Sequence, residues 1–308
     1  MNNILWLIRR EIWENRSLWI APLVLGGVLL ITAAFGGMHI GGNNGFSFGF
    51  NADSTSEAEV RHAIAGGPLD KRQFIYAATL SGFTVVQLLI MSIVLFFYLL
   101  DTLLAERKDR SILFWKSLPV SDTEVVASKL ATAIVVVPLF VLTVSAVLHV
   151  LFGMVWWVRF HNSPLGGLLM SWDTVTWLNV QASFLLFIAV GILWYLPLMT
   201  YLMLVSVWAR RNAFLWAVLP PLSILLIEAI ISQSHYFADF LGRRLVGLFQ
   251  LFDLESQLGK GHERLPALGD TLALISNPLS SQETWFGVLA AAAMFVVIVR
   301  IRRMRDDS

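Results

Sequence analysis

Residues 106 to 121 form the part of this chain whose residue types are best suited to binding a partner. The segment opens with a mixed charged cluster and continues with a short apolar and aromatic stretch that Pro119 ends. Apolar and aromatic side chains inside a charged rim are typical of a protein docking site. Burial in a lipid interface suits the same aromatic residues, so that alternative stays open. The candidate docking residues are Glu106, Arg107, Arg110, Ser111, Ile112, Leu113, Phe114, Trp115, Lys116, Leu118 and Pro119.

A second group of polar residues lies within apolar stretches and is a candidate for a transport pathway: Glu228, Gln87, Tyr98 and Tyr195. Glu228 is the one acid well inside an apolar run, and intramembrane acids are often functional. It follows Asn212 by 16 positions, or about 24 Å of helix, so a structural role near an interface is the alternative. For the others, hydrogen bonding between helices is the alternative. Asp101, near the end of an apolar run, is expected to be hydrated or paired with Arg107.

The usual enzymatic motifs are missing from the sequence. The six His show no ligand spacing, so we expect no metal site. Gly259-Lys260-Gly261 does not match a phosphate-binding loop, so ATP and Mg²⁺ would be bound by a partner and no cofactor directly by this chain. Neither a Gly-x-Ser-x-Gly nor a His-Glu-x-x-His motif is present. An intramembrane enzyme is therefore disfavoured.

Composition indicates what kind of protein must position these residues. Of 308 residues, 57% are hydrophobic and 14% are charged, whereas about 25% of the residues in a soluble domain are charged. So few charges cannot cover the surface of a soluble protein of this length. The composition predicts an integral membrane protein and excludes a disordered chain and a nucleic-acid binder. With no Cys, a disulfide-linked secreted domain is excluded too.

Long runs free of Asp, Glu, Lys and Arg predict six membrane-spanning helices, because a bilayer core about 30 Å thick needs roughly 20 apolar residues. We expect these spans at about residues 18–38, 74–104, 125–153, 178–208, 212–232 and 284–303. Capping boxes that begin at Ser121 and Ser280 precede the third and sixth spans. The predicted fold class is an all-α membrane protein in which residues 1–308 form one transmembrane domain.

The distribution of positive charge predicts the orientation. With the N-terminus inside, 14 of the 22 Lys and Arg lie on the inner side, and the other 8 lie in longer outer loops. We therefore expect a multi-pass protein of the cell (inner, cytoplasmic) membrane with both termini in the cytoplasm.

Residues 1–16 have the pattern of an amphipathic helix. Ile4, Leu5, Ile8 and Ile12 fall within a sector of about 100° on a helix, and the charged residues lie largely elsewhere. This pattern predicts an interfacial helix on the cytoplasmic side of the membrane. A continuous extension of the first span is the alternative.

The outer segment 233–283 is too long for an ordinary connection between two helices. Its mixture of apolar and charged residues is amphipathic, so we expect re-entrant or interfacial helices between spans five and six. A re-entrant hairpin would line the exit of a pathway, since irregular backbone at membrane depth needs protein or water around it. A lateral interfacial helix without a transport role is the alternative.

Residues 106–121 resemble the first cytoplasmic loop of type-2 ATP-binding-cassette (ABC) exporter permeases. The resemblance rests on Glu106, Arg107, Ser111, Ser117, Leu118, Pro119, Val120, Ser121 and Lys129. In that family this coupling loop sits in a groove of the ATPase subunit. The family also has an N-terminal connecting helix, six spans and re-entrant helices before the sixth span, so the resemblance in layout covers the whole chain. The first outer loop, residues 37–72, departs from it by being long.

The resemblance implies a permease subunit of an ABC exporter without ATPase motifs of its own. Two permease subunits, identical or homologous, would form the substrate pathway within the membrane lipid. Two separate ATPase subunits would dock on the coupling loop, and no nucleic acid is expected as a partner. An ion-gradient-driven secondary transporter is the alternative, although the sequence shows no inverted repeat and few central ionisable residues.

Overall fold

The computed structural model describes residues 3–35, 37–41, 45–49, 69–109, 120–162, 174–232, 235–251 and 268–304. Six helices there are long and apolar enough to cross a membrane: Ser17–Phe35, Leu80–Lys108, Asp122–Arg159, Thr174–Trp208, Ala213–Ile231 and Gln282–Met304. The predicted all-α membrane fold with six spans is therefore confirmed, and the chain is a multi-pass membrane protein.

The helices that precede and form the first four spans are as follows: α1 (Asn3–Glu14), α2 (Ser17–Phe35), α4 (Leu69–Lys108), α6 (Asp122–Ala131), the π-helical turn η1 (Thr132–Val136), α7 (Val137–Phe160) and α9 (Thr174–Trp208). The remaining elements are α10 (Ala213–Ile227), the π-helical turn η2 (Glu228–Ser232), α11 (Tyr236–Leu251), α13 (Leu268–Ser280) and α14 (Gln282–Met304). The helices expected between spans five and six are thus present as α11 and α13.

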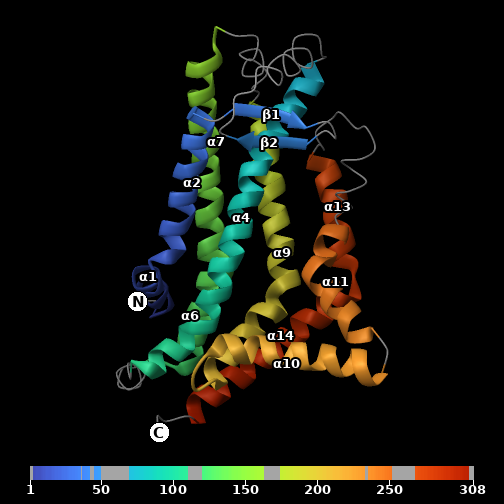
Figure 1. The fold of residues 1–308 in the computed structure, drawn as a ribbon. Helices are drawn as coiled ribbons and strands as arrows, with labels where there is room; N and C mark the ends of the chain where they lie inside the picture. Colours follow the sequence, from blue (N-terminus) through green and yellow to red (C-terminus); the bar gives the residue numbers. More distant parts are fainter. Residues whose placement is uncertain are drawn as a thin grey trace.

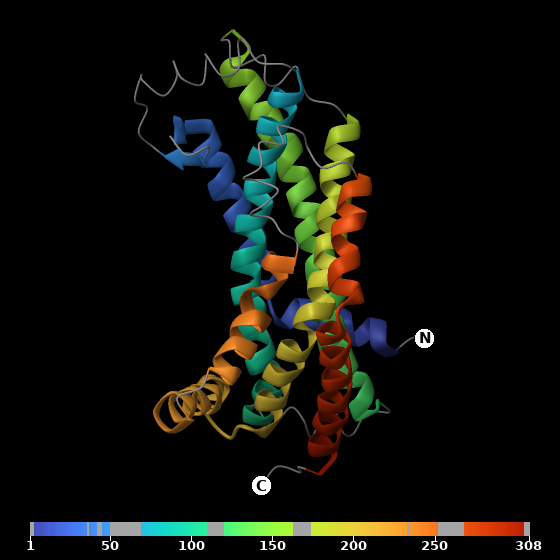
Figure 2. The same cartoon turned by 90° about the vertical axis from the view of Figure 1, so that its right-hand side faces the viewer.

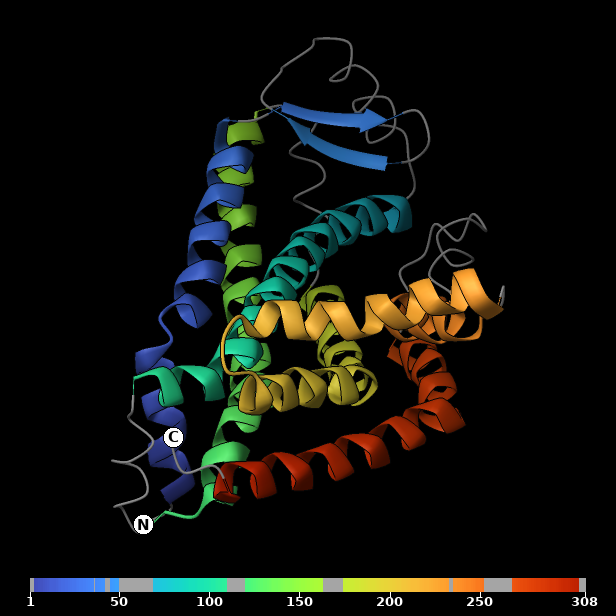
Figure 3. The same cartoon turned by 60° about the horizontal axis from the view of Figure 1, so that its bottom comes forward.

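The long helices α4, α7 and α9 pack against one another along the centre of the molecule (Figures 1 and 2). Both ends of the chain lie in the lower half of Figure 1. Figure 3 shows α1, α6 and the C-terminal end of α14 gathered there. We call this region the terminal end of the bundle.

A short antiparallel hairpin lies at the opposite end, formed by β1 (Gly37–Gly41) and β2 (Gly45–Gly49) (Figure 1). Gly37 pairs with Gly49, and Gly41 pairs with Gly45. The sequence predicted an outer loop over residues 37–72 and placed the end of the first span at about residue 38, three residues beyond the observed end of α2. Between the glycines, the β-favouring residue types Ile40, Phe46 and Phe48 explain why the segment pairs as strands.

The third span contains a π-helical turn that the sequence did not predict. Pro138 has no backbone N–H, so a regular helix would leave a carbonyl without a partner one turn earlier. In η1 the N–H of Val137 donates instead to the carbonyl of Thr132, five residues back. Such π-helical turns absorb a local break in the regular hydrogen-bond pattern. The span therefore continues from α6 through η1 into α7.

The capping box predicted at Ser121 is present, whereas the one predicted at Ser280 is replaced by a single N-cap at Ser281. Ser121 Oγ accepts the Glu124 N–H at 3.2 Å, and Glu124 Oε2 accepts the Ser121 N–H at 2.8 Å. Before α14 the cap is Ser281, whose Oγ accepts the Thr284 N–H at 3.3 Å. The prediction of a capping box that starts at Ser280 was wrong, because α13 extends through Ser280 and the N–H of Ser281 donates to the Pro278 carbonyl.

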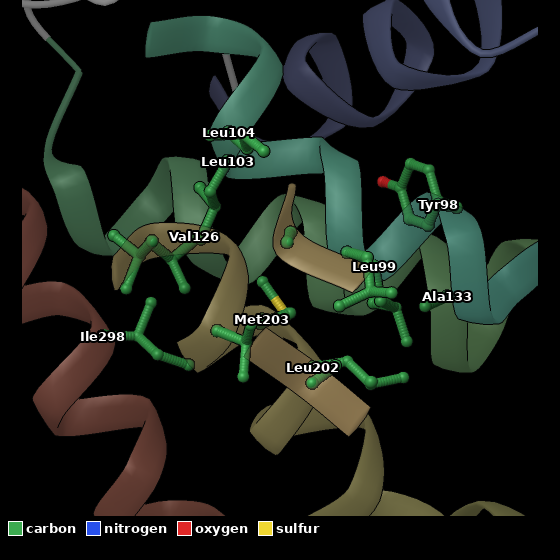
Figure 4. Close-up of a cluster of buried hydrophobic side chains, with 14 of the residues drawn as sticks. Tyr98, Leu99, Leu103, Leu104, Val126, Ala133, Leu202, Met203 and Ile298 are labelled. Carbon is green, nitrogen blue, oxygen red and sulfur yellow. The ribbon is translucent and has the colours of Figure 1, made fainter. Parts of the chain in front are cut away.

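An apolar core joins four helices near the terminal end. Leu103 from α4, Val126 from α6, Met203 from α9 and Ile298 from α14 converge there, each no more than 1% exposed (Figure 4). Between helices in a membrane, such packing is stabilised mainly by van der Waals contacts. This core fixes the relative positions of the helices that carry the charged residues described next.

Candidate functional site at the terminal end

A chain of buried ion pairs lies beside the apolar core. Lys129 Nζ is 2.6 Å from Glu11 Oε1 and 3.0 Å from Glu106 Oε1. Arg302 Nη1 is 2.6 Å from Glu106 Oε2, and its Nε is 3.0 Å from Asp122 Oδ1. The charges alternate in the order Glu11, Lys129, Glu106, Arg302 and Asp122. These five residues, from α1, α4, α6 and α14, are called the ion cluster below.

Helical spacing explains why the ion cluster forms at this level. Glu106 follows Leu103 by three positions, Lys129 follows Val126 by three, and Arg302 follows Ile298 by four. Residues three or four apart lie on the same face of a helix. The charged residues therefore lie on the same helix faces as the apolar core. Glu106 and Arg302 lie toward the terminal end, whereas the backbone of Lys129 lies on the other side of Val126, because α6 runs opposite to α4 and α14.

Four of the five members of the ion cluster are almost completely buried, and Asp122 is partly exposed. The side chains of Glu11, Lys129 and Arg302 are each 2% exposed, that of Glu106 is 4% exposed, and that of Asp122 is 21% exposed. A buried charge is tolerated only when it is paired and hydrogen-bonded. Glu11 meets this condition through Lys129 and also through the Tyr98 hydroxyl, which donates to Oε2 at 3.0 Å. The cluster thus constrains the positions of its four helices.

Arg302 connects the two ends of the predicted coupling loop. Glu106 belongs to the last turn of α4, before the loop, and Asp122 is the first residue of α6, after it. One guanidinium binds both carboxylates. A displacement of either end of the loop therefore changes an ion pair with α14.

The N-terminal helix α1 is bound to the same structure through Glu11. Leu7 and Glu11 face the protein and are buried, whereas Trp6 and Trp13 are largely exposed. The predicted apolar stripe lies beside this face: Ile4 and Leu5 are exposed, and Ile8 and Ile12 are half-buried. Sequence reasoning assigned Glu11 no role, since periodicity alone does not show that a charged residue will be buried.

A second connection joins the end of α4 to the end of α9. Arg107 Nη2 donates to the carbonyls of Ser206 and Ala209, both at 2.6 Å. Cationic side chains stabilise helix C-termini in this way. Ser206 Oγ accepts the N–H groups of Leu103 and Leu104 at 3.0 and 3.1 Å. The connection between α9 and α10 is thereby held to the helix that leads into the predicted coupling loop.

Of the eleven predicted docking residues, the structure describes Glu106 and Arg107; those from Arg110 to Pro119 lie outside the described residues. Both described side chains point into the bundle, so they position the loop. Asp101, expected to be hydrated or paired with Arg107, is 66% exposed and lies 4.0 Å from Lys108. Whether the loop docks a partner stays a prediction.

The four candidate pathway residues each connect two elements. Gln87 Nε2 donates to the Pro22 carbonyl at 3.4 Å, which joins α4 to α2. The Tyr195 hydroxyl donates to the Leu245 carbonyl at 2.9 Å, which joins α9 to α11. Tyr98 belongs to the hydrogen bonds of the ion cluster. These contacts agree with the structural alternative for each residue.

Glu228 also has a structural contact. Its carboxylate accepts the N–H of Phe237 at 2.9 and 3.0 Å and the N–H of Ala238 at 3.1 Å. A carboxylate at a helix N-terminus satisfies free donors and interacts favourably with the helix dipole. Glu228 therefore caps α11, the first helix between spans five and six.

A buried polar cluster around His149 was not identified from the sequence. Gln181 Nε2 lies 2.8 Å from Nδ1, and Leu80 O lies 3.1 Å from Nε2. Thr84 Oγ1 is 3.1 Å from Nε2 and 2.6 Å from Ser145 Oγ. Both ring nitrogens are thus engaged in joining α4, α7 and α9. Within the described part of the chain, no three His, Asp or Glu side chains come together as a metal site would require.

Comparisons with protein-family models, with curated proteins and with solved structures found no match to this chain. The basis for a function is therefore the residue pattern of the loop and the geometry of the helices that carry it.

Proposed function

We propose that this chain is the membrane-spanning permease subunit of an ABC exporter, coupled to a separate ATPase subunit through residues 106–121. The main support is the placement of both ends of that loop. Glu106 and Asp122 are held by Arg302, and Lys129 connects Glu106 to α1. A segment that receives force from a partner needs such rigid attachment to the helices that must move.

In this proposal, closure of the ATPase subunits on ATP displaces the loop between α4 and α6. Arg302 transfers the displacement to α14, and Lys129 with Glu11 transfers it to α1. Arg107 and Ser206 couple the end of α4 to the connection between α9 and α10. Coupling thus requires two arrangements of packed helices, and the ion cluster is the element that would differ between them.

The topology and partners follow from the same proposal. The terminal end of the bundle faces the cytoplasm of a cell membrane, where the ATPase subunits bind ATP and Mg²⁺. Two permease subunits, identical or homologous, enclose the pathway. Trp6 and Trp13 are exposed on α1, as expected for a helix at a membrane interface.

A co-purification experiment tests the proposal. The full chain is expressed with a candidate ATPase subunit, and association is measured for the wild type and for a variant lacking residues 112–116. Loss of both association and ATP-dependent transport is expected, because the apolar and aromatic centre of the docking segment is removed. Gly27→Ala, in α2 and outside the proposed coupling route, adds a methyl group into open space; it is the control and should retain both.

Two results would contradict the proposal. One is a deletion variant that still binds the ATPase and transports in response to ATP. The other is transport that stops when the proton and sodium gradients are dissipated while ATP is present, which would identify a secondary transporter.

A further inference from the structure

An open groove lies beside the ion cluster, between the start of α2, the last four turns of α4 and the start of α10. It has a volume of about 550 Å³, within the range of pockets that bind small ligands. Val94 lies at one end of its α4 wall and Lys108 at the other. Fourteen residues of helix separate them, or about 21 Å. The groove is therefore long enough for an elongated ligand.

The two halves of the groove differ in chemistry. Val94, Phe97 and Phe214 line the half that lies deeper along α4. The Phe97 and Phe214 rings are stacked at 6.4 Å between centroids, and both are about half exposed. Asp101 and Lys108 line the other half. The apolar half extends about 10 Å from Asp101 toward the centre of the membrane span. Only an amphiphilic ligand matches both halves.

The charged half presents one group of each sign. Lys108 Nζ and Asp101 Oδ1 are 4.0 Å apart, and their side chains are 52% and 66% exposed. An exposed pair at that distance is weak, so a ligand that carries both charges can replace it. A phosphate would approach Lys108, and a primary ammonium would approach Asp101.

We infer that this groove binds a zwitterionic glycerophospholipid with a primary ammonium headgroup, the chemistry of phosphatidylethanolamine. The headgroup occupies the charged half at the membrane interface, and the upper acyl chains contact Phe97 and Phe214. Headgroup regions add several ångströms to each side of a bilayer core of about 30 Å, which matches a groove that changes from apolar to charged along one helix. The inference requires a membrane protein but does not depend on coupling to ATP.

The location gives the lipid a route to the ion cluster. Tyr98 lines the groove, and its hydroxyl donates to Glu11. A lipid whose acyl chains contact Phe97 and Phe214 therefore also lies against Tyr98, the side chain that holds the carboxylate paired with Lys129. Occupancy of the groove is expected to stabilise the attachment of α1.

Binding can be measured on the delipidated full chain by native mass spectrometry. The probes are phosphatidylethanolamine, phosphatidylcholine and phosphatidylglycerol with the same acyl chains. The wild type should bind phosphatidylethanolamine roughly fivefold more tightly than phosphatidylcholine, whose quaternary ammonium cannot donate a hydrogen bond. Asp101→Asn should abolish this preference, and Lys108→Met should weaken the binding of all three lipids alike. Asp109→Asn and Arg210→Gln change exposed charges outside the groove and should change nothing.

A second measurement locates the lipid. Because the chain has no Cys, Ser17→Cys places a single thiol on the groove. Its maleimide labelling should slow severalfold in vesicles that contain phosphatidylethanolamine, relative to vesicles of phosphatidylcholine.

Three results would overturn the inference. The first is equal binding of phosphatidylethanolamine and phosphatidylcholine by the wild type. The second is equal slowing of labelling by inorganic phosphate, which would show a site for small anions. The third is shielding of the thiol that follows dimer formation and not lipid content, which would place a second copy of the chain in the groove.

Discussion

Replacing Lys129 by methionine should strongly destabilise this protein, because Lys129 separates two buried carboxylates. Its Nζ lies 2.6 Å from Glu11 Oε1 and 3.0 Å from Glu106 Oε1, so these oxygens are no more than about 6 Å apart. Without the cation, two like charges at this distance repel by roughly 3 kcal/mol at an effective dielectric constant of about 20. Breaking a buried ion pair from one side typically costs 3–5 kcal/mol. Lys129→Met should therefore lower the free energy of unfolding by about 3–5 kcal/mol.

Equilibrium unfolding in mixed micelles with increasing sodium dodecyl sulfate provides the assay. Glu11→Gln combined with Lys129→Met should recover roughly 2 kcal/mol of the loss, because Glu106 keeps Arg302 as its partner and no second buried carboxylate opposes it. Lys108→Met, which opens an exposed pair, is the control and should cost no more than about 1 kcal/mol. The reasoning is refuted if Lys129→Met costs under about 1 kcal/mol, or if the double variant is no more stable than the single one.

Three further predictions concern packing and helix ends, each measured by the same unfolding assay. Gly26→Ala should lower the free energy of unfolding by about 1–3 kcal/mol, because its Cβ would lie 2.8 Å from Leu148 Cδ1. Gly27→Ala places its methyl group in open space and should be neutral or stabilising. Equal effects of the two substitutions would contradict this packing. Glu228→Gln should cost about 1–2 kcal/mol and speed hydrogen exchange in the first turn of α11, and unchanged exchange would exclude the cap. Asn212→Val should cost about 1–2 kcal/mol because its φ is 49°, while Asn212→Gly should be tolerated; equal tolerance would contradict a left-handed residue here.

Features set by local sequence were predictable. The six spans follow from apolar runs, and the capping box at Ser121 follows from residues three positions apart. The hairpin β1–β2 was missed because its glycines resemble a loop, and the π-helical turn before Pro138 was missed because helical periodicity does not show a single added residue.

The ion cluster could not be predicted from the sequence, for a different reason. Lys129 is 118 positions from Glu11, and Arg302 is 196 positions from Glu106. No periodicity connects residues so far apart. The resemblance of residues 106–121 to a coupling loop drew attention to Glu106, but as part of a docking surface. Because Glu106 is buried, it contacts α6 and α14 instead of an outside partner.

The alternating order of the ion cluster suggests what it contributes beyond stability. Apolar residues of similar volume often stabilise a protein as well as a buried ion pair does, so stability alone does not explain why charges occupy this position. Apolar surfaces also tolerate several registers. In the cluster, by contrast, Lys129 and Arg302 each lie between two carboxylates, and a slide of one helix by one turn, about 5.4 Å, would bring like charges together. We infer that the cluster limits α1, α4, α6 and α14 to few discrete arrangements, which the proposed coupling through residues 106–121 would require.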